Sequence, residues 1–236
     1  MLILWDIDHT LIDVGGFDRA MWSMISSRLL VTEGLPVTVI PGSTIRPILR
    51  SALAQHGASP ERAEELLPQA LAAELDWLTD TDRIAGAGVV LPGVRAAIRR
   101  LADQPRIVQS ILTGNQRRSA ELKLTAFGLL DHVDLTVGAY GSDDDHRPSL
   151  VPIAQRRTAE RYDDAILQPT VLIGDSVRDI AAARESGSAV IAVGTGPTSV
   201  ADLESAGADV VLPDLSDTDA LVAAIDRLDG VREPSA

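Results

Sequence analysis

The chain has 236 residues, of which 45% are apolar and 23% charged, a composition ordinary for a globular protein and too apolar for a disordered one. A formal net charge of -13 opposes binding to nucleic acid or to an anionic membrane surface. The absence of cysteine excludes disulfides, thiolate metal sites and a cysteine nucleophile. We therefore expect no nucleic acid and no membrane partner, and a monomer or homodimer.

The first segment predicts a buried strand that ends in an acidic residue. Leu2–Trp5 is a short apolar run, the pattern of a strand buried on both faces, and Asp6 follows it directly. The chain starts without the basic flank of a signal peptide and has no apolar run of membrane-spanning length. We therefore expect a cytoplasmic protein.

The segment from 15 to 90 has a helical character. Amphipathic stretches are separated by Gly, Pro and Ser, and they predict helices near Phe17–Leu30, Ile45–Gln55 and Pro60–Leu78. We interpret residues 15–90 as an inserted helical domain. The main domain would then comprise residues 1–14 and 91–236.

Strands and helices alternate through the main domain. The predicted strands are Ile107–Leu112, Val133–Val137, Thr170–Ile173, Ala189–Val193 and Val210–Leu212. The predicted helices are Gly93–Ala102, Gln116–Phe127, Leu150–Tyr162, Val177–Ser186, one after Val200 and one closing near Leu228, before a loose tail at 230–236. This alternation predicts an α/β doubly wound parallel sheet, in which ligands bind beyond the carboxyl ends of the strands.

Two carboxylates stand at the end of the first predicted strand. Asp6 and Asp8 can both turn toward one crevice, where a hard divalent cation would offset their repulsion. The alternative is that either acid only caps a turn or the next helix. Taken alone, this pair does not decide between the two interpretations.

A hydroxyl side chain and a glycine follow the strand at Ile107–Leu112. Thr113 and the backbone N–H groups near Gly114 can hold phosphate oxygens, because a helix N-terminus favours an anion. An ordinary N-cap and turn is the alternative.

A third strand end adds two acids. Asp175 and Asp179 lie one helical turn apart and can face one cation directly or through water, which suits magnesium. Each can instead be a capping residue. Three polar strand ends at one edge favour a common site over three independent caps.

In these three places the chain resembles the haloacid dehalogenase superfamily, in the phosphatase branch of phosphoglycolate phosphatases and β-phosphoglucomutases. The family motif DxDx[TV], the hydroxyl residue after an apolar strand and the motif GDxxxD are matched by Asp6, Asp8, Thr10, Thr113, Gly174, Asp175 and Asp179. The resemblance extends from Met1 to about Leu228. It implies a Rossmann-like core, and the helical insert is similar in position to the family's helical cap.

The resemblance also implies roles for these residues. Asp6 would be the nucleophile that forms an aspartyl-phosphate, and Asp8 the general acid and base, protonated at the start of the cycle. Mg²⁺ would be held at Asp6, the Asp8 carbonyl and Asp175, with support from Asp179. The phosphoryl group would contact Thr113, Gly114 and Asn115.

The remaining site residues are assigned by position. Arg147 precedes a proline, as the basic residue of the third family motif does, and would neutralise the nucleophile and the transferred oxygens; Arg156 and Arg157 are alternatives. His9 replaces a common glycine and would either reach the leaving group or fill space. Ser43 and Arg46 lie in a glycine-containing turn of the insert and are candidates for substrate contact.

Asp8 decides the expected reaction type. Dehalogenation needs no acid for the leaving group, and phosphonate hydrolases would also lack this residue, whereas hydrolysis of a phosphomonoester needs one. We therefore expect a magnesium-dependent phosphatase for a small phosphorylated metabolite, preferably a sugar phosphate. A phosphomutase and a non-catalytic metal- or phosphate-binding module are the alternatives.

Overall fold

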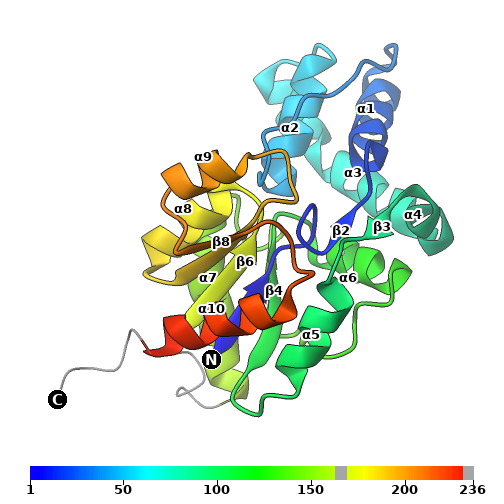
Figure 1. Ribbon diagram of the computed structural model, residues 1–236. Coiled ribbons are helices and arrows are strands. Elements are labelled where there is room, and N and C mark those ends of the chain that lie inside the picture. The colour runs from blue at the N-terminus through cyan, green and yellow to red at the C-terminus, as the bar shows by residue number, and fades with distance from the viewer. Residues whose placement is uncertain (163–168, 231–236) are drawn as a thin grey trace.

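A parallel sheet forms the centre of the molecule in the computed structural model, which describes residues 1–162 and 169–230. Its six described strands are arranged in the order β5-β4-β1-β6-β7-β8, and all neighbours pair in parallel (Figure 1). Their bounds are β1 Leu2–Trp5, β4 Val108–Thr113, β5 Ala139–Tyr140, β6 Thr170–Gly174, β7 Ala189–Val193 and β8 Val210–Leu212. The predicted α/β fold with a doubly wound parallel sheet is confirmed.

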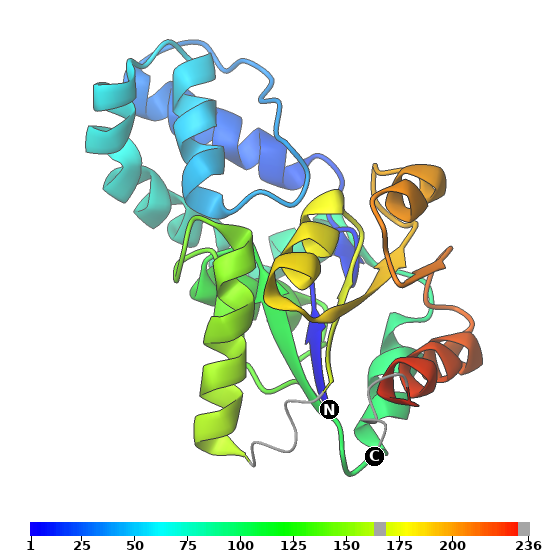
Figure 2. The same ribbon diagram turned by 90° about the vertical axis from the view of Figure 1, so that its left-hand side faces the viewer.

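Helices cover both faces of this sheet (Figures 1 and 2). Ile3 and Trp5 of β1 belong to the apolar cluster that also contains residues of α5 Val94–Ala102, α6 Arg117–Ala126 and α10 Thr218–Gly230. Leu2 and Leu4 belong to a second cluster with α7 Leu150–Arg161, α8 Val177–Ser186 and α9 Val200–Ser205. Successive side chains of a strand point to opposite faces, which is why the continuous apolar run of β1 is buried in two layers.

A group of helices lies beyond the carboxyl ends of the strands (Figure 1). They are α1 Phe17–Leu30, α2 Ile45–Gln55, α3 Pro60–Leu78 and α4 Thr81–Ala87. A short antiparallel pair, β2 Ile12–Asp13 with β3 Val89–Val90, joins this helical segment to the rest of the chain. The first three helices have the expected bounds; α4 and the strand pair are too short to produce a periodic pattern. The division into domains at 15–90 stays a prediction. None of the described helices has both the length and the apolarity that a membrane span requires.

The strand predicted at Val133–Val137 is wrong. Its alternation reflects burial, since Val133 and Val137 are both buried, but the segment forms turns and the strand of this region is β5. The Asp134 side chain accepts hydrogen bonds from the N–H and the hydroxyl of Thr136, at 2.8 and 2.6 Å. This local bonding competes with strand pairing. Of the predicted tail, Gly230 ends α10, and 231–236 lie outside the described residues.

A buried carboxyl connects α3 of the helical segment with α6. Glu74 is 1% exposed and accepts hydrogen bonds from the Ser119 hydroxyl, at 2.9 Å, and from the Gln116 amide, which also donates to the Leu71 carbonyl. Burial raises the pKa of Glu74 to about 7, although the hydrogen bonds from Gln116 and Ser119 act against it. Burial of this carboxyl therefore costs the folded state least when the carboxyl is protonated.

We expect the pH dependence of stability to weaken in Glu74→Gln. Between an ordinary value of 4.5 and the folded pKa of about 7 the folded state binds more protons than the unfolded chain. The free energy of unfolding therefore falls as the pH rises through this window, by up to about 3 kcal/mol from this one group. Urea unfolding at pH 5 and pH 8 measures the difference. Glu65→Gln, an exposed position on the same helix, is the control, and an equal pH slope in both variants would contradict the prediction.

Candidate active site

Asp6 is held at the carboxyl end of β1 by its backbone and by an arginine. Its N–H donates to the Ile173 carbonyl at 2.9 Å, which extends the pairing with β6. The Arg147 Nη2 atom lies 2.9 Å from Asp6 Oδ1 and 2.6 Å from Asp179 Oδ1, and both Asp6 and Arg147 are buried. Arg147, the residue that the sequence suggested as the cation of the site, thus lies next to Asp6. Of its alternatives, Arg157 pairs with Asp143, and Arg156 is exposed on α7.

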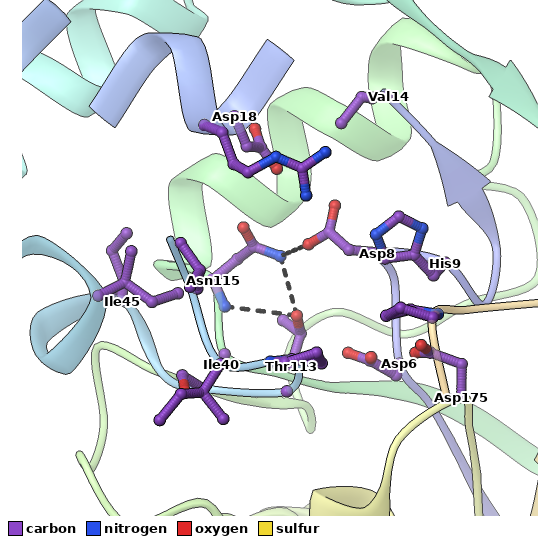
Figure 3. Close-up of a pocket in the computed structure, with 18 of the residues that line it drawn as sticks. Asp6, Asp8, His9, Val14, Asp18, Ile40, Ile45, Thr113, Asn115 and Asp175 are labelled. Atoms are coloured by element: carbon purple, nitrogen blue, oxygen red, sulfur yellow. Dashed lines mark hydrogen bonds between the residues drawn. The ribbon is translucent and has the colours of Figure 1, made fainter. Parts of the chain in front are cut away.

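The Asp8 side chain, on the same loop as Asp6, is held by Lys123 and Asn115. Its Oδ1 accepts from Lys123 Nζ at 2.8 Å. Its Oδ2 accepts from Asn115 Nδ2 at 2.6 Å (Figure 3). Burial favours the neutral form, but the Lys123 ammonium and the two hydrogen bonds outweigh burial and hold the pKa of Asp8 below its ordinary value. In this arrangement Asp8 is a carboxylate, whereas the family resemblance implies that it starts the cycle protonated.

Lys123 is a site residue that sequence reasoning missed. It is 1% exposed, and besides Asp8 it donates to Asp18 Oδ2 at 2.6 Å and to Asn115 Oδ1 at 3.1 Å. An ammonium has three donors and no acceptor, and here each donor meets an oxygen. Lys123 is the only lysine among 21 Lys and Arg residues, and this is the one signal in the sequence by which it could have been found. It joins α6, the loop after β1, and α1.

Three acids gather beside Arg147. Asp6, Asp175 and Asp179 each offer a carboxylate oxygen, and these oxygens lie within 4.8 Å of one another. Burial raises the pKa of Asp6 to about 7, with Arg147 acting against it, and raises that of Asp175 to about 8, with Asp6 and Asp179 adding to the effect. One guanidinium does not balance three carboxylates, so the set fits a hard divalent cation with oxygen ligands. The Asp8 side chain is not among these oxygens.

Asp179 has a structural role as well. Ser176 and Asp179 form a capping box at the start of α8, in which Asp179 Oδ2 accepts from the Ser176 hydroxyl at 2.6 Å and from its N–H at 3.1 Å. The other oxygen accepts from Arg147. The capping interpretation is therefore correct for Asp179, and its charge still adds to the acidic cluster.

The segment after β4 brings a hydroxyl and an amide to the same place. Thr113 Oγ1 accepts from Asn115 Nδ2 at 2.9 Å and from its N–H at 3.3 Å (Figure 3). Thr113 is not the cap of α6, which begins after Gln116 without a side-chain cap. A Cβ atom at Gly114 would lie 2.2 Å from the Ser43 carbonyl oxygen. Glycine at this position therefore allows the helical segment to approach the strand end.

One cavity connects these groups. Of the predicted site residues, those that line it are Asp6, Asp8, His9, Ser43, Thr113, Gly114, Asn115, Arg147 and Asp175. Figure 3 shows Asp6 and Asp175 on one side of this space and Ile40 and Ile45 on the other. His9 takes a left-handed conformation, with φ of 60°, and its ring lies 3.7 Å from Asp13. This position is compatible with both interpretations of His9.

Arg46 is not among the residues that line the cavity. It lies on α2 and donates to Asp145 Oδ1 at 3.2 Å and to the carbonyl oxygens of Gly141 and Ser142. Arg50, one turn later, donates to the other Asp145 oxygen at 2.6 Å. The sequence suggested substrate contact because it could not show how this helix meets the β5–α7 loop. Arg46 instead joins the helical segment to that loop.

The comparisons with known proteins agree with this geometry. A curated phosphoglycolate phosphatase from Chromobacterium violaceum is 30% identical over 138 residues, which is 58% of each chain, so the match spans just over half of that relative. A solved structure described as a predicted phosphatase from Clostridium acetobutylicum has a TM-score of 0.68 at 18% identity, with 96% of this chain and 98% of that chain covered. A putative β-phosphoglucomutase from Bacteroides vulgatus has a TM-score of 0.65 at 16% identity, with 97% and 89% covered.

The family model of the haloacid dehalogenase-like hydrolases matches residues 3–184. This range includes the acids after β1, the Thr113 segment, Arg147 and the acids after β6. The resemblance of the sequence motifs is thereby confirmed. The chain belongs to the haloacid dehalogenase-like hydrolase family.

Proposed function

We propose that the protein is a magnesium-dependent phosphatase that hydrolyses a small phosphomonoester through an aspartyl-phosphate on Asp6. The observation that carries this proposal is the position of the Asp6 carboxylate, which lines the cavity with Arg147 at 2.9 Å and Asp8 two residues away. A nucleophile, a cation for the transferred oxygens and an acid–base group are thus within one site.

The chain's own residues account for the two half-reactions. The Asp6 carboxylate attacks phosphorus, the bond from phosphorus to the ester oxygen breaks, and Asp8 supplies the proton to the leaving alkoxide. A bound phosphomonoester brings negative charge next to Asp8, which favours the protonated form against the pull of Lys123. Asp8 then takes a proton from water as that water attacks the phosphorus of the aspartyl-phosphate. The bond from phosphorus to the Asp6 oxygen breaks, which releases inorganic phosphate and restores the Asp6 carboxylate.

Mg²⁺ fits the acidic cluster and would be held by Asp6, Asp175 and the Asp8 carbonyl, with Asp179 adding charge. When bound, it would neutralise charge between the anionic nucleophile and the anionic phosphoryl group. The raised pKa values of Asp6 and Asp175 support this proposal, because burial first, and the neighbouring carboxylates after it, disfavour the charged forms that a bound cation would stabilise.

We expect phosphate release from an aryl phosphate to require magnesium. Chelation with EDTA should lower the rate roughly tenfold or more, because the repulsion between Asp6 and the phosphoryl group is then unrelieved, and added Mg²⁺ should restore it. A colorimetric phosphate assay measures this, with circular dichroism as the control for folding. Full activity in EDTA would contradict the proposed metal, and transfer of phosphate to a second substrate hydroxyl without release would indicate a mutase.

A cytoplasmic location and a monomer or homodimer stay predictions.

A further inference from the structure

The first residues of α2 are bound to two loops at the carboxyl ends of the strands. The Ile45 N–H donates to the Gly114 carbonyl at 2.8 Å, in the segment after β4. The Thr44 hydroxyl donates to the backbone carbonyl of Asp145 at 2.6 Å, in the β5–α7 loop. Thr44 occupies the N-cap position of α2 but forms no side-chain cap, although a threonine there ordinarily accepts from helix N–H groups. Its hydroxyl instead joins the helical segment to the loop.

Asp145 also binds α2 through its side chain. Its Oδ1 accepts from Arg46 at 3.2 Å and its Oδ2 from Arg50 at 2.6 Å, so both oxygens meet guanidinium groups one turn apart on the helix. An isolated exposed ion pair stabilises little, but here one residue makes three contacts with one helix start. The residues of these contacts, which we call the Asp145 clasp, are Thr44, Arg46, Arg50 and Asp145.

The clasp closes over a contact that leaves no room for a side chain. A Cβ atom at Gly141, which begins the same loop, would lie 2.0 Å from the Gly114 carbonyl oxygen and 3.2 Å from the Ile45 nitrogen. The loop, the segment after β4 and the start of α2 therefore meet backbone to backbone. A small shift of α2 would be felt by both loops.

The clasp lies next to the cation of the site. Arg147 follows Asp145 by two residues, and its Nη1 atom donates to the carbonyl of Gly42, which precedes Thr44 by two residues. Its Nη2 atom lies 2.9 Å from Asp6. The guanidinium is therefore held between Asp6 and the turn that the clasp fixes. Loss of the clasp would release the Gly42 carbonyl, one of the groups that orient Arg147.

We propose that Asp145 is a positioning residue, which acts through the turn of residues 40–44 to hold Arg147 in place beside Asp6. This inference rests on the proposed phosphatase function, in which Arg147 neutralises the transferred oxygens. Asp145 is not among the described residues that line the cavity, so its effect on the reaction passes through these contacts. Misplacing a catalytic group by about 1 Å can lower a rate about 100-fold.

Asp145→Asn should lower kcat/KM for an aryl phosphate about tenfold, because the amide carries no charge for the two guanidinium groups and the turn loosens. Asp143→Asn is the matched control. Asp143 lies in the same loop, but its side chain bonds to Arg157 and to the Tyr140 N–H, both outside the helical segment. Its substitution should change kcat/KM less than about twofold. An unchanged value in Asp145→Asn, or an equal loss in both variants, would overturn the inference.

Binding of inorganic phosphate in the presence of Mg²⁺ tests the position of Arg147 without turnover. Its dissociation constant, measured by calorimetry, should rise at least about fivefold in Asp145→Asn and stay near the wild-type value in Asp143→Asn. This result would support the inference even if the proposed hydrolysis is wrong. Equal affinity in wild type and Asp145→Asn would overturn it, whatever the assay of phosphate release shows.

Spin labels report on the clasp directly. The chain has no cysteine, so two introduced cysteines carry the labels without competing thiols. Gln69 on α3 and Glu160 on α7 are exposed and lie on the two sides of the clasp. The distribution of distances between the labels should broaden in Asp145→Asn and keep its width in Asp143→Asn. An unchanged width in Asp145→Asn would overturn the clasp.

Arg46→Gln breaks the clasp from the side of the helix. The double variant of Arg46→Gln and Asp145→Asn should lose about as much kcat/KM as Asp145→Asn alone, since both substitutions remove one shared contact. Losses that multiply would show that Arg46 and Asp145 act independently, and would overturn the clasp.

Discussion

Asp6→Asn is expected to lower phosphate release roughly 10⁴-fold or more, because an amide cannot form the aspartyl-phosphate on which both half-reactions depend. The fold should remain intact. Asp6 is buried beside two other acids, and burial raises its pKa to about 7, so removing its charge relieves repulsion at the cost of the contact with Arg147. Single-turnover phosphate release and thermal unfolding measure the two effects.

Asp103→Asn is the matched control for that experiment. Asp103 is an exposed residue just after α5, on the side of the sheet where β4 begins, and its substitution should change neither rate nor melting temperature. Turnover by Asp6→Asn at more than about one hundredth of the wild-type rate would contradict covalent catalysis at this position.

Lys123→Met should have the largest effect on stability. It removes a fully buried ammonium and leaves Asp18, whose side chain is 11% exposed, without its cation. Breaking such a pair by deleting one partner costs about 3–5 kcal/mol. We also expect kcat to fall more than KM rises, because Asp8 loses one of the two groups that orient it. Urea unfolding and steady-state kinetics measure these changes.

A double variant distinguishes the structural role of Lys123 from its effect on Asp8. Adding Asp18→Asn to Lys123→Met removes the unpaired buried charge and should recover much of the lost stability. Asp8 would still lack its ammonium partner, so kcat should stay low. If kcat recovers in step with stability, Lys123 acts on folding alone.

The sequence predicts those parts of the site that are local to one strand end. Asp6 and Asp175 each follow an apolar run, and the crossover rule for parallel strands brings them to one edge of the sheet. Arg147 was found only through the proline that follows it. The bound metal and the roles of these residues remain proposals, which rest on the structure and on the family resemblance together.

The missed features depend on contacts between distant elements. Lys123 meets Asp18 because α6 and α1 approach each other, and Arg46 meets Asp145 because α2 lies on the β5–α7 loop. No period or short motif encodes such approaches. The false strand at Val133–Val137 has a different cause, since burial in a turn produced the same alternation as a strand.

The single lysine makes this site selectively visible by NMR. Growth with lysine labelled with ¹³C at Cε places one labelled side chain in the whole protein, at the atom next to the nitrogen that contacts Asp8 and Asp18. The shift of that one signal depends on the seating of α1, which supplies Asp18, and on the state of Asp8. One resonance thus follows the approach of the helical segment and the filling of the cavity, without assignment of any other residue.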